Sequence, residues 1–232
     1  DILDAMYARR HDFELPAMTP EQAVQAALRM DGRVLIIDTP DSIGGGASGD
    51  SPALLAAILA HAPDTPSALA IVDPAAVRRA QELGVGTEEE FDIGAWQDRR
   101  WFKPVRVTAR VERLCDGKFV YRGGPVAGAT GRLGPSAVLR VGGLRILVAS
   151  HAVYEHLDEH YATCGIDIAD CKIVSFKQLM NFRKLLGPGV DFIALHGQGG
   201  TPLRLQDVAW QNRRRPWWPA DDMDVPARLP DT

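Results

Sequence analysis

Short apolar runs alternate with amphipathic segments along most of the chain, a pattern typical of strands that alternate with helices. The apolar runs predict buried strands at 33–38, 68–72, 172–176 and 192–195. Helical periodicity predicts helices at 20–30, from 50 or 51 to 63, at 73–84, 152–162 and 179–186. Because strands and helices alternate in this order, the pattern indicates an α/β fold with a mixed, largely parallel sheet flanked by helices.

Two of the expected helices begin with local capping signals. Thr19 is a suitable N-cap, Pro20 suits the first helical position, and Gln22 completes a capping box. Asp73 and Pro74 repeat the combination of a cap and a proline before the helix that ends near residue 84. These signals predict where both helices start.

The middle of the chain, at 105–150, has a different pattern. Apolar and polar residues alternate there and glycine is frequent, which predicts an antiparallel β unit inserted into the α/β body. The dipeptides Asp116-Gly117 and Gly142-Gly143 stand between alternating runs and predict hairpin turns. The segment 205–232 has little periodicity, so we expect an extended C-terminal arm whose tryptophans pack on the domain.

A glycine loop at 38–52 follows the first buried strand and precedes an alanine-rich helix pattern. Gly44, Gly45 and Gly46 permit positive φ angles and a close approach of another group. The N-terminus of the following helix favours an anion. The loop is therefore a candidate site for an anion, a carboxylate or a partner segment. The alternative is that its glycines serve only a tight turn and close packing.

Known nucleotide-binding patterns do not match this loop in full. No Gly-Lys-Ser/Thr follows it, so it is not a P-loop. Gly44, Gly46 and Gly49 have the spacing of G-x-G-x-x-G, but no acidic residue closes a strand beyond them until Asp73. The spacing alone is a weak indication of dinucleotide binding.

Two basic residues follow the expected strand at 172–176. Ligands in open α/β sheets bind at the carboxyl ends of the strands. If this strand lies parallel and next to the strand at 33–38, then Lys177, Arg183 and the glycine loop face one crevice. The alternative is that Lys177 is an ordinary surface lysine.

A second candidate centre is the H-x-x-E-H pattern of His156, Glu159 and His160. On a helix the two histidines would share a face and could bind zinc, with Glu159 as the general base. The sequence shows no evident third protein ligand. Histidines on a solvated, acidic helix face would give the same pattern.

Composition narrows the class of function. The chain has 232 residues, of which 46% are hydrophobic, and a net charge of −4. This charge argues against a nucleic-acid partner, and no apolar run is long enough to span a membrane. Cys115, Cys164 and Cys171 are odd in number and lack C-x-x-C spacing. This cysteine pattern predicts reduced thiols in a cytoplasmic protein.

Ordered motifs along the chain point to one protein family. The segment 38–50 reads D-x-x-D-S-I-G-G-G-x-x-G-D, and further motifs stand at 116–124, 131–143, 165–167, 173–177, 182–183 and 215–219. Together, from about Tyr7 to Asp222, they resemble the C-terminal domain of the MlrC-like (microcystinase C) metallopeptidases. The family's Asn-Pro is replaced by Ser42-Ile43, and Asn181 stands where the family has histidine. These departures suggest a different substrate or a weakened site.

The resemblance implies a zinc-dependent hydrolase of peptide or amide bonds whose zinc ligands lie in an N-terminal domain. It implies that residues 1–232 are a C-terminal domain, with 1–18 as a lead-in, and that this chain holds no catalytic metal. It therefore argues against a zinc site at His156 and His160. The partners it implies are the N-terminal catalytic domain and a peptide or amide substrate.

The resulting hypothesis is that this chain completes a catalytic cleft and is inactive alone. The residues expected to bind substrate or the other domain are Asp41, Gly44, Gly45, Gly46, Gly49, Asp50, Lys177 and Arg183. Three rival hypotheses stay open: a non-catalytic module that binds small anions, an autonomous H-x-x-E-H zinc hydrolase, and a structural or oligomerising unit of an inactive protein.

Overall fold

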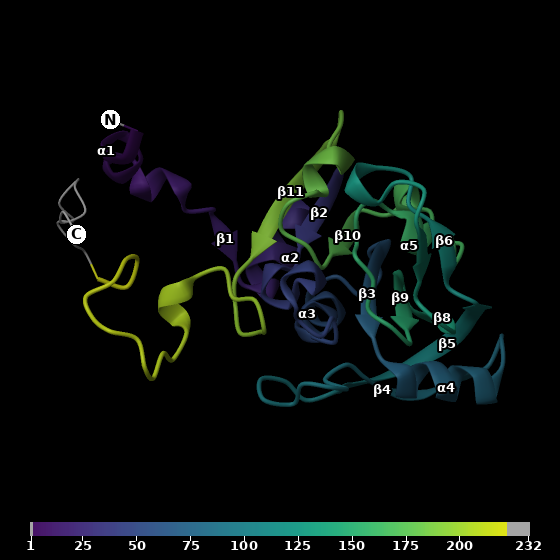
Figure 1. Ribbon diagram of the computed structural model, residues 1–232. Coiled ribbons are helices and arrows are strands. Elements are labelled where there is room, and N and C mark those ends of the chain that lie inside the picture. The colour runs from purple at the N-terminus through teal and green to yellow at the C-terminus, as the bar shows by residue number, and fades with distance from the viewer. Residues whose placement is uncertain (1, 222–232) are drawn as a thin grey trace.

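A computed structural model describes residues 2–221 of the chain (Figure 1). Its helices are α1 (Ile2–Ala8), α2 (Pro20–Arg29), α3 (Ala53–His61), α4 (Pro74–Leu83) and α5 (Glu159–Ala162). Its strands are β1 (Ala17–Met18), β2 (Arg33–Ile37), β3 (Ser67–Val72), β4 (Glu88–Ile93), β5 (Val105–Cys115), β6 (Lys118–Val120), β7 (Thr130–Arg132), β8 (Ser136–Val141), β9 (Leu144–Ala149), β10 (Ile173–Phe176) and β11 (Val190–Leu195). Short 3-10 helices lie at Arg10–Phe13, Thr39–Asp41, Ile43–Gly45, Gly124–Val126, Ile168–Asp170, Phe182–Leu185 and Leu205–Asp207.

One mixed sheet organises the domain. Its strand order is β1-β11-β2-β10-β3-β9-β8-β5-β4, and β6 pairs with β7 in a separate small sheet. The pairs from β1 to β9 are parallel, whereas β9, β8, β5 and β4 pair in antiparallel fashion. The predicted α/β fold with a largely parallel sheet and an antiparallel part is confirmed.

The two faces of the sheet bury separate hydrophobic clusters. One cluster joins buried residues of α2, α3 and α4 to strand residues such as Ile36 and Ile146. The other joins Leu35 and Leu147, which point to the opposite face, to Tyr161 of α5 and to Phe176 and Phe182. Successive residues of a strand point to opposite faces of the sheet. Because both faces of the central strands are buried in these clusters, their sequences are continuous hydrophobic runs.

Local capping signals correctly located the starts of α2 and α4. The Thr19 side chain accepts a hydrogen bond from the Gln22 N–H, and the Gln22 side chain accepts one from the Thr19 N–H, so the capping box is present. The Asp73 carboxylate accepts the N–H groups of Ala75 and Ala76. Helix α3 begins at Ala53 with Pro52 as its N-cap, two or three residues later than the predicted start at 50 or 51.

The antiparallel region differs from the prediction in its turns. Gly142-Gly143 joins the paired strands β8 and β9, so that hairpin is confirmed. Asp116-Gly117 does not close a hairpin, because β5 pairs with β8 whereas β6 pairs with β7. The turn instead carries the chain from the large sheet to the small one. A dipeptide signal reports a reversal of the chain but not the partner of each strand.

Strand β4 was not predicted from the sequence. It begins with three consecutive glutamates, and only Phe91 and Ile93 are buried. As the edge strand of the sheet it has one paired neighbour, β5. Charged side chains are common on edge strands, where they discourage pairing with other chains. The same glutamates interrupt the apolar pattern by which a strand is recognised in the sequence.

Two predicted helices are mostly absent. Only Glu159–Ala162 of the segment 152–162 is helical, and only Phe182–Leu185 of 179–186 forms a short 3-10 helix. In the first segment, Glu155 and His156 are buried. The Glu159 carboxylate there accepts the N–H groups of Leu157 and Arg122. The burial of these polar residues and the contact with the distant Arg122 outweigh the local helical preference.

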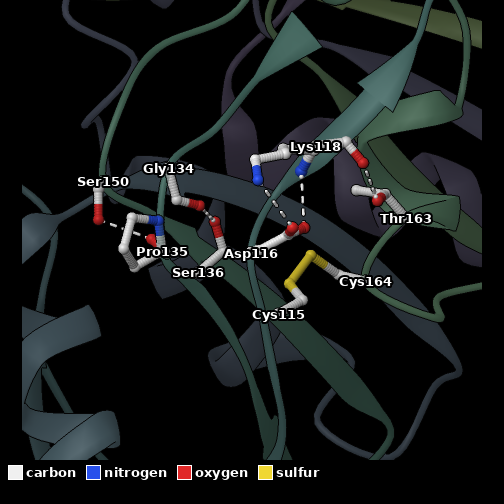
Figure 2. The surroundings of a disulfide bond; sticks show 9 residues. All are labelled: Cys115, Asp116, Lys118, Gly134, Pro135, Ser136, Ser150, Thr163 and Cys164. Atoms are coloured by element: carbon white, nitrogen blue, oxygen red, sulfur yellow. Dashed lines mark hydrogen bonds and ion pairs between the residues drawn. A yellow bond between two sulfur atoms is a disulfide. The ribbon is translucent and has the colours of Figure 1, made fainter.

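The prediction of three reduced cysteines is wrong. Cys115, at the end of β5, forms a disulfide with Cys164, which follows α5, and Cys171 is free and buried. Figure 2 shows that the Thr163 hydroxyl also donates a hydrogen bond to the Lys118 carbonyl beside this disulfide. The cysteine pattern therefore no longer supports a cytoplasmic location. No helix within residues 2–221 is long and apolar enough to cross a membrane.

The two ends of the described chain lie together beyond the β1 edge of the sheet (Figure 1). The ring centroids of Trp218 and His11 are 4.8 Å apart. Trp217 is buried, and its ring centroid lies 5.8 Å from that of Trp210. The described part of the predicted C-terminal arm, 205–221, is thus mostly irregular and packs through its tryptophans. Residues 222–232 of that arm lie outside the described residues.

Candidate functional site

The glycine loop leaves β2 at the carboxyl edge of the parallel strands. Two short 3-10 turns, Thr39–Asp41 and Ile43–Gly45, carry the chain outward, and positive φ angles of 95° at Gly46 and 76° at Gly49 bring it back. Gly44, Gly45 and Gly46 are exposed, whereas Gly49 is buried. The triple glycine therefore forms a bare backbone tip above a buried base.

The Asp41 carboxylate is the internal support of this loop. One of its oxygens accepts the Gly49 N–H at 2.9 Å, and the other accepts the Ser51 N–H at 2.8 Å. Asp41 is only 3% exposed. Both ends of the loop are thus tied to one buried carboxylate, which restricts the position of the glycine tip.

Lys177 reaches the same carboxylate from the neighbouring strand. Strand β10 pairs with β2 in parallel, with Phe176 opposite Ile37, so Lys177 emerges beside Asp38. Its ammonium nitrogen lies 2.8 Å from carboxylate oxygens of both Asp38 and Asp41. Burial alone would lower the pKa of Lys177, but the two carboxylates outweigh burial and raise that pKa above its ordinary value. Lys177 is therefore protonated and fully engaged inside the protein.

Glu155 extends this buried polar cluster. Its carboxylate accepts the backbone N–H of Lys177 at 2.5 Å, and its other oxygen lies 4.0 Å from Nε2 of His160. Burial raises the pKa of Glu155 to about 7, and burial lowers the pKa of His160 to about 3. The cluster therefore contains a neutral imidazole near neutral pH, beside a carboxyl group whose pKa is raised by its burial.

Asp50 links the glycine loop to the connection between β4 and β5. One carboxylate oxygen accepts the N–H groups of Gln97 and Asp98, at 2.6 and 3.0 Å. The Ser48 hydroxyl donates to the other oxygen. Asp50 is 3% exposed, so it acts as a buried clamp between two surface segments. A cavity of about 560 Å³ lies between them and includes Arg99 and Arg100.

Three further side chains surround the tip of the loop. Thr201 accepts the Ser42 N–H and donates to the Thr39 carbonyl. A Cβ on Gly44 would lie 3.2 Å from the ring of Tyr154, whose hydroxyl accepts a hydrogen bond from Asn181. Asn181, which stands where the family motif has histidine, is therefore linked to the glycine tip through Tyr154.

The structure brings most of the predicted site residues together. The loop glycines, Asp41, Asp50 and Lys177 form one region, while Arg183 stacks over the rings of Phe182 and Phe192 instead. Sequence reasoning missed the contributions of Glu155 and Thr201. No local pattern marks either residue, since each reaches the loop only through the tertiary fold. Asp38 could have been found, because it directly follows the buried strand that ends at Ile37.

The H-x-x-E-H residues do not share a helix face, because α5 begins only at Glu159. His156 is fully buried against Gly124, and His160 packs against the rings of Tyr161 and Phe176. The Glu159 carboxylate is engaged by backbone N–H groups. Within residues 2–221 no group of three or more histidine, cysteine or acidic side chains is arranged to hold a metal ion.

Comparisons with known proteins agree on the kind of domain. The family model described as "MlrC C-terminus" matches residues 36–212. Microcystinase C of Sphingomonas sp. is 27% identical over 188 residues, which span 80% of this chain but 35% of that protein. A crystal structure of a candidate metallopeptidase from Mesorhizobium sp. BNC1 has a TM-score of 0.82 at 24% identity, over 96% of this chain and 45% of that chain. The likeness to the Mesorhizobium structure shows that the two chains share a fold.

Proposed function

Because the chain belongs to the MlrC C-terminus family, we propose that it is the C-terminal domain of a zinc-dependent peptidase or amidohydrolase and completes its substrate cleft. The chain spans about a third of microcystinase C and under half of the Mesorhizobium protein. In this proposal the rest of such a protein is an N-terminal catalytic domain, which is the partner of the present chain. We refer to a protein that contains both parts as the longer protein.

In this proposal the zinc ion is held by the N-terminal domain. The donor groups of the present chain do not form a metal site within the described residues, and the two histidines of the H-x-x-E-H pattern are buried and do not share a helix face. A zinc ion supplies an activated water molecule and polarises the scissile carbonyl in enzymes of this kind. The residues of this chain contribute position and shape.

The observation that carries the proposal is the buried support under an exposed glycine tip. Lys177, Asp38 and Asp41 hold the base of the loop, so their charges are not available to a substrate. The exposed backbone at 44–46 has no side chain beyond Cα, which allows the main chain of a peptide to approach closely. The loop lies at the carboxyl edge of parallel strands, where ligands of open α/β sheets bind.

The test compares the 232-residue chain with the longer protein after both are incubated with zinc and freed of excess metal. The measurements are zinc content by mass spectrometry and hydrolysis of a linear peptide. We expect about one tightly held zinc ion per longer protein, with hydrolysis, and neither property in the shorter chain. A shorter chain that retains stoichiometric zinc, loses it in His156→Ala and hydrolyses the peptide would replace this proposal with an autonomous zinc hydrolase.

A further inference from the structure

The cavity between the glycine loop and the β4–β5 connection has features that the loop alone does not explain. It is lined on one side by residues 46–48 and on the other by residues 97–100, and Gly200 also contributes. A Cβ on Gly46 would meet no atom within 4 Å, whereas one on Gly200 would lie 3.3 Å from Ala47. The loop therefore presents open backbone on one side and is tightly packed on the other.

The β4–β5 connection is held in place at a conformational cost. Ala95 has a φ of 48°, in the left-handed region that alanine rarely adopts, and it is fully buried. Its N–H donates to the Asp50 carbonyl at 2.8 Å. The preceding Gly94 donates to the Asp73 carboxylate. Strain of this kind persists only where surrounding contacts hold it, and it is frequent at functional sites.

One positive charge in this cavity is not compensated. Arg100 makes two hydrogen bonds to the Asp98 carboxylate, and Asp50 is engaged by backbone N–H groups. Arg99 is exposed, its Nε donates to the Ala95 carbonyl at 3.3 Å, and it makes no ion pair in the part of the chain that the structure describes. The terminal nitrogens of its guanidinium group are therefore available to a ligand.

We infer that this cavity binds the carboxylate group of a peptide substrate, with Arg99 as the cationic contact. A guanidinium group binds a carboxylate through two parallel hydrogen bonds. The inference names a substrate group, so its biological meaning rests on the proposed function, but the binding step requires no hydrolysis.

The experiment titrates the 232-residue chain with N-acetyl-alanine, with its uncharged amide, and with inorganic phosphate. Amide chemical shifts in the nuclear magnetic resonance spectrum report both affinity and location. We expect N-acetyl-alanine to shift Ser48 and Gln97 and the amide to produce no saturable shift. Phosphate that binds more tightly than the carboxylate would overturn the assignment of the ligand, as would equal shifts from the acid and the amide.

Three variants test the contact. Arg99→Ala is expected to weaken binding about tenfold or more, the loss typical of charge-assisted hydrogen bonds. Arg99→Lys is expected to be intermediate, because lysine cannot form the paired hydrogen bonds. Arg110→Ala is the matched control, since this exposed arginine of β5 lines a different cavity. Unchanged affinity in Arg99→Ala would contradict the inference.

The results distinguish a failure of the carboxylate site from a failure of the proposed hydrolase function. If the chain binds N-acetyl-alanine through Arg99 but the longer protein cleaves no peptide, the carboxylate site stands and the proposed hydrolase is wrong. If the longer protein cleaves peptides with unchanged kcat and KM in Arg99→Ala, the hydrolase stands and the carboxylate site is wrong.

Discussion

Thr201 lies so close to Gly45 that a Cβ on Gly45 would be 2.6 Å from the Thr201 Cγ2. The hydroxyl of the same threonine accepts the Ser42 N–H at 2.9 Å and donates to the Thr39 carbonyl at 2.8 Å. The methyl group thus restricts residue 45 to glycine, while the hydroxyl supports the loop. Substitution can separate these two effects.

We predict that Gly45→Ala destabilises the chain by about 1–3 kcal/mol, the usual cost of overpacking. Adding Thr201→Ser should recover most of this loss, because serine keeps the hydroxyl and lacks the methyl group. Urea denaturation measures both. Gly187→Ala is the control, since a Cβ there would meet no atom within 4 Å. A double variant as unstable as the single one would show that the methyl contact is not the cause.

Disruption of the cluster of Lys177, Asp38 and Asp41 under the loop should lower the free energy of unfolding by more than Gly45→Ala does. Lys177→Met leaves Asp38 and Asp41 buried without their cation, so we expect a loss of about 3–5 kcal/mol. Adding Asp38→Asn should recover part of it by removing one uncompensated carboxylate. Lys184→Met, at an exposed position, is the control and should change stability by less than about 0.5 kcal/mol. Equal unfolding free energies for the two lysine variants would contradict this role of Lys177.

The buried pair of Glu155 and His160 predicts a specific pH dependence. The pKa of Glu155 is raised from 4.5 to about 7. Between these values the folded state binds more protons than the unfolded state, so this group's stabilising contribution falls as pH rises. The pKa of His160 is lowered from 6.5 to about 3, so its contribution rises with pH between these values. The two slopes oppose each other from about pH 4.5 to 6.5.

Glu155→Gln removes one of these opposing effects, and glutamine can still accept the Lys177 N–H. We predict that, relative to the wild type, this variant gains stability as pH rises from about 4.5 to 7. The gain should total a few kcal/mol, since one pKa unit corresponds to about 1.4 kcal/mol. Urea denaturation of both proteins across this range gives the difference. A difference that does not vary with pH would mean that Glu155 is ionised throughout.

The disulfide should contribute to stability. It closes a loop with a sequence separation of 49 residues between Cys115 and Cys164, for which chain entropy predicts a contribution of about 4 kcal/mol. Dithiothreitol should therefore lower the stability of the wild type and leave the variant with serine at both positions unchanged. Labelling of free thiols before and after reduction provides the count. Three reactive thiols in the unfolded, unreduced wild type would show that the bond is absent.

The parts of the fold that could be predicted are those set by neighbouring residues. Thr19 and Asp73 cap helices through hydrogen bonds to residues two or three positions away, and the central strands are apolar on both faces. Strand β4 and the segment 152–158 could not be predicted in this way. Their structure depends on the edge position of β4 and on the distant partners of residues 152–158. Their local composition therefore predicts no strand in the first case and a helix in the second.

The candidate site shows the same division. The meeting of Lys177 with the glycine loop follows from two apolar runs that each end in a polar segment, once those runs are taken as parallel neighbours. The buried state of Lys177 does not follow, because it depends on two aspartates pointing inward. The disulfide was missed because residues 115 and 164 are brought together only by the fold.

The kcat/KM of the longer protein for a linear peptide, measured when the glycine tip is altered, tests directly whether this domain completes the substrate cleft. If the tip lines the substrate cleft, Gly45→Ala should lower kcat/KM by about tenfold to a hundredfold, with zinc content unchanged. Thr201→Ser should restore it in the same chain, and Gly187→Ala should have no effect. A Gly45→Ala protein that folds less stably but keeps the wild-type kcat/KM would show that the loop is structural and that this domain does not complete the cleft.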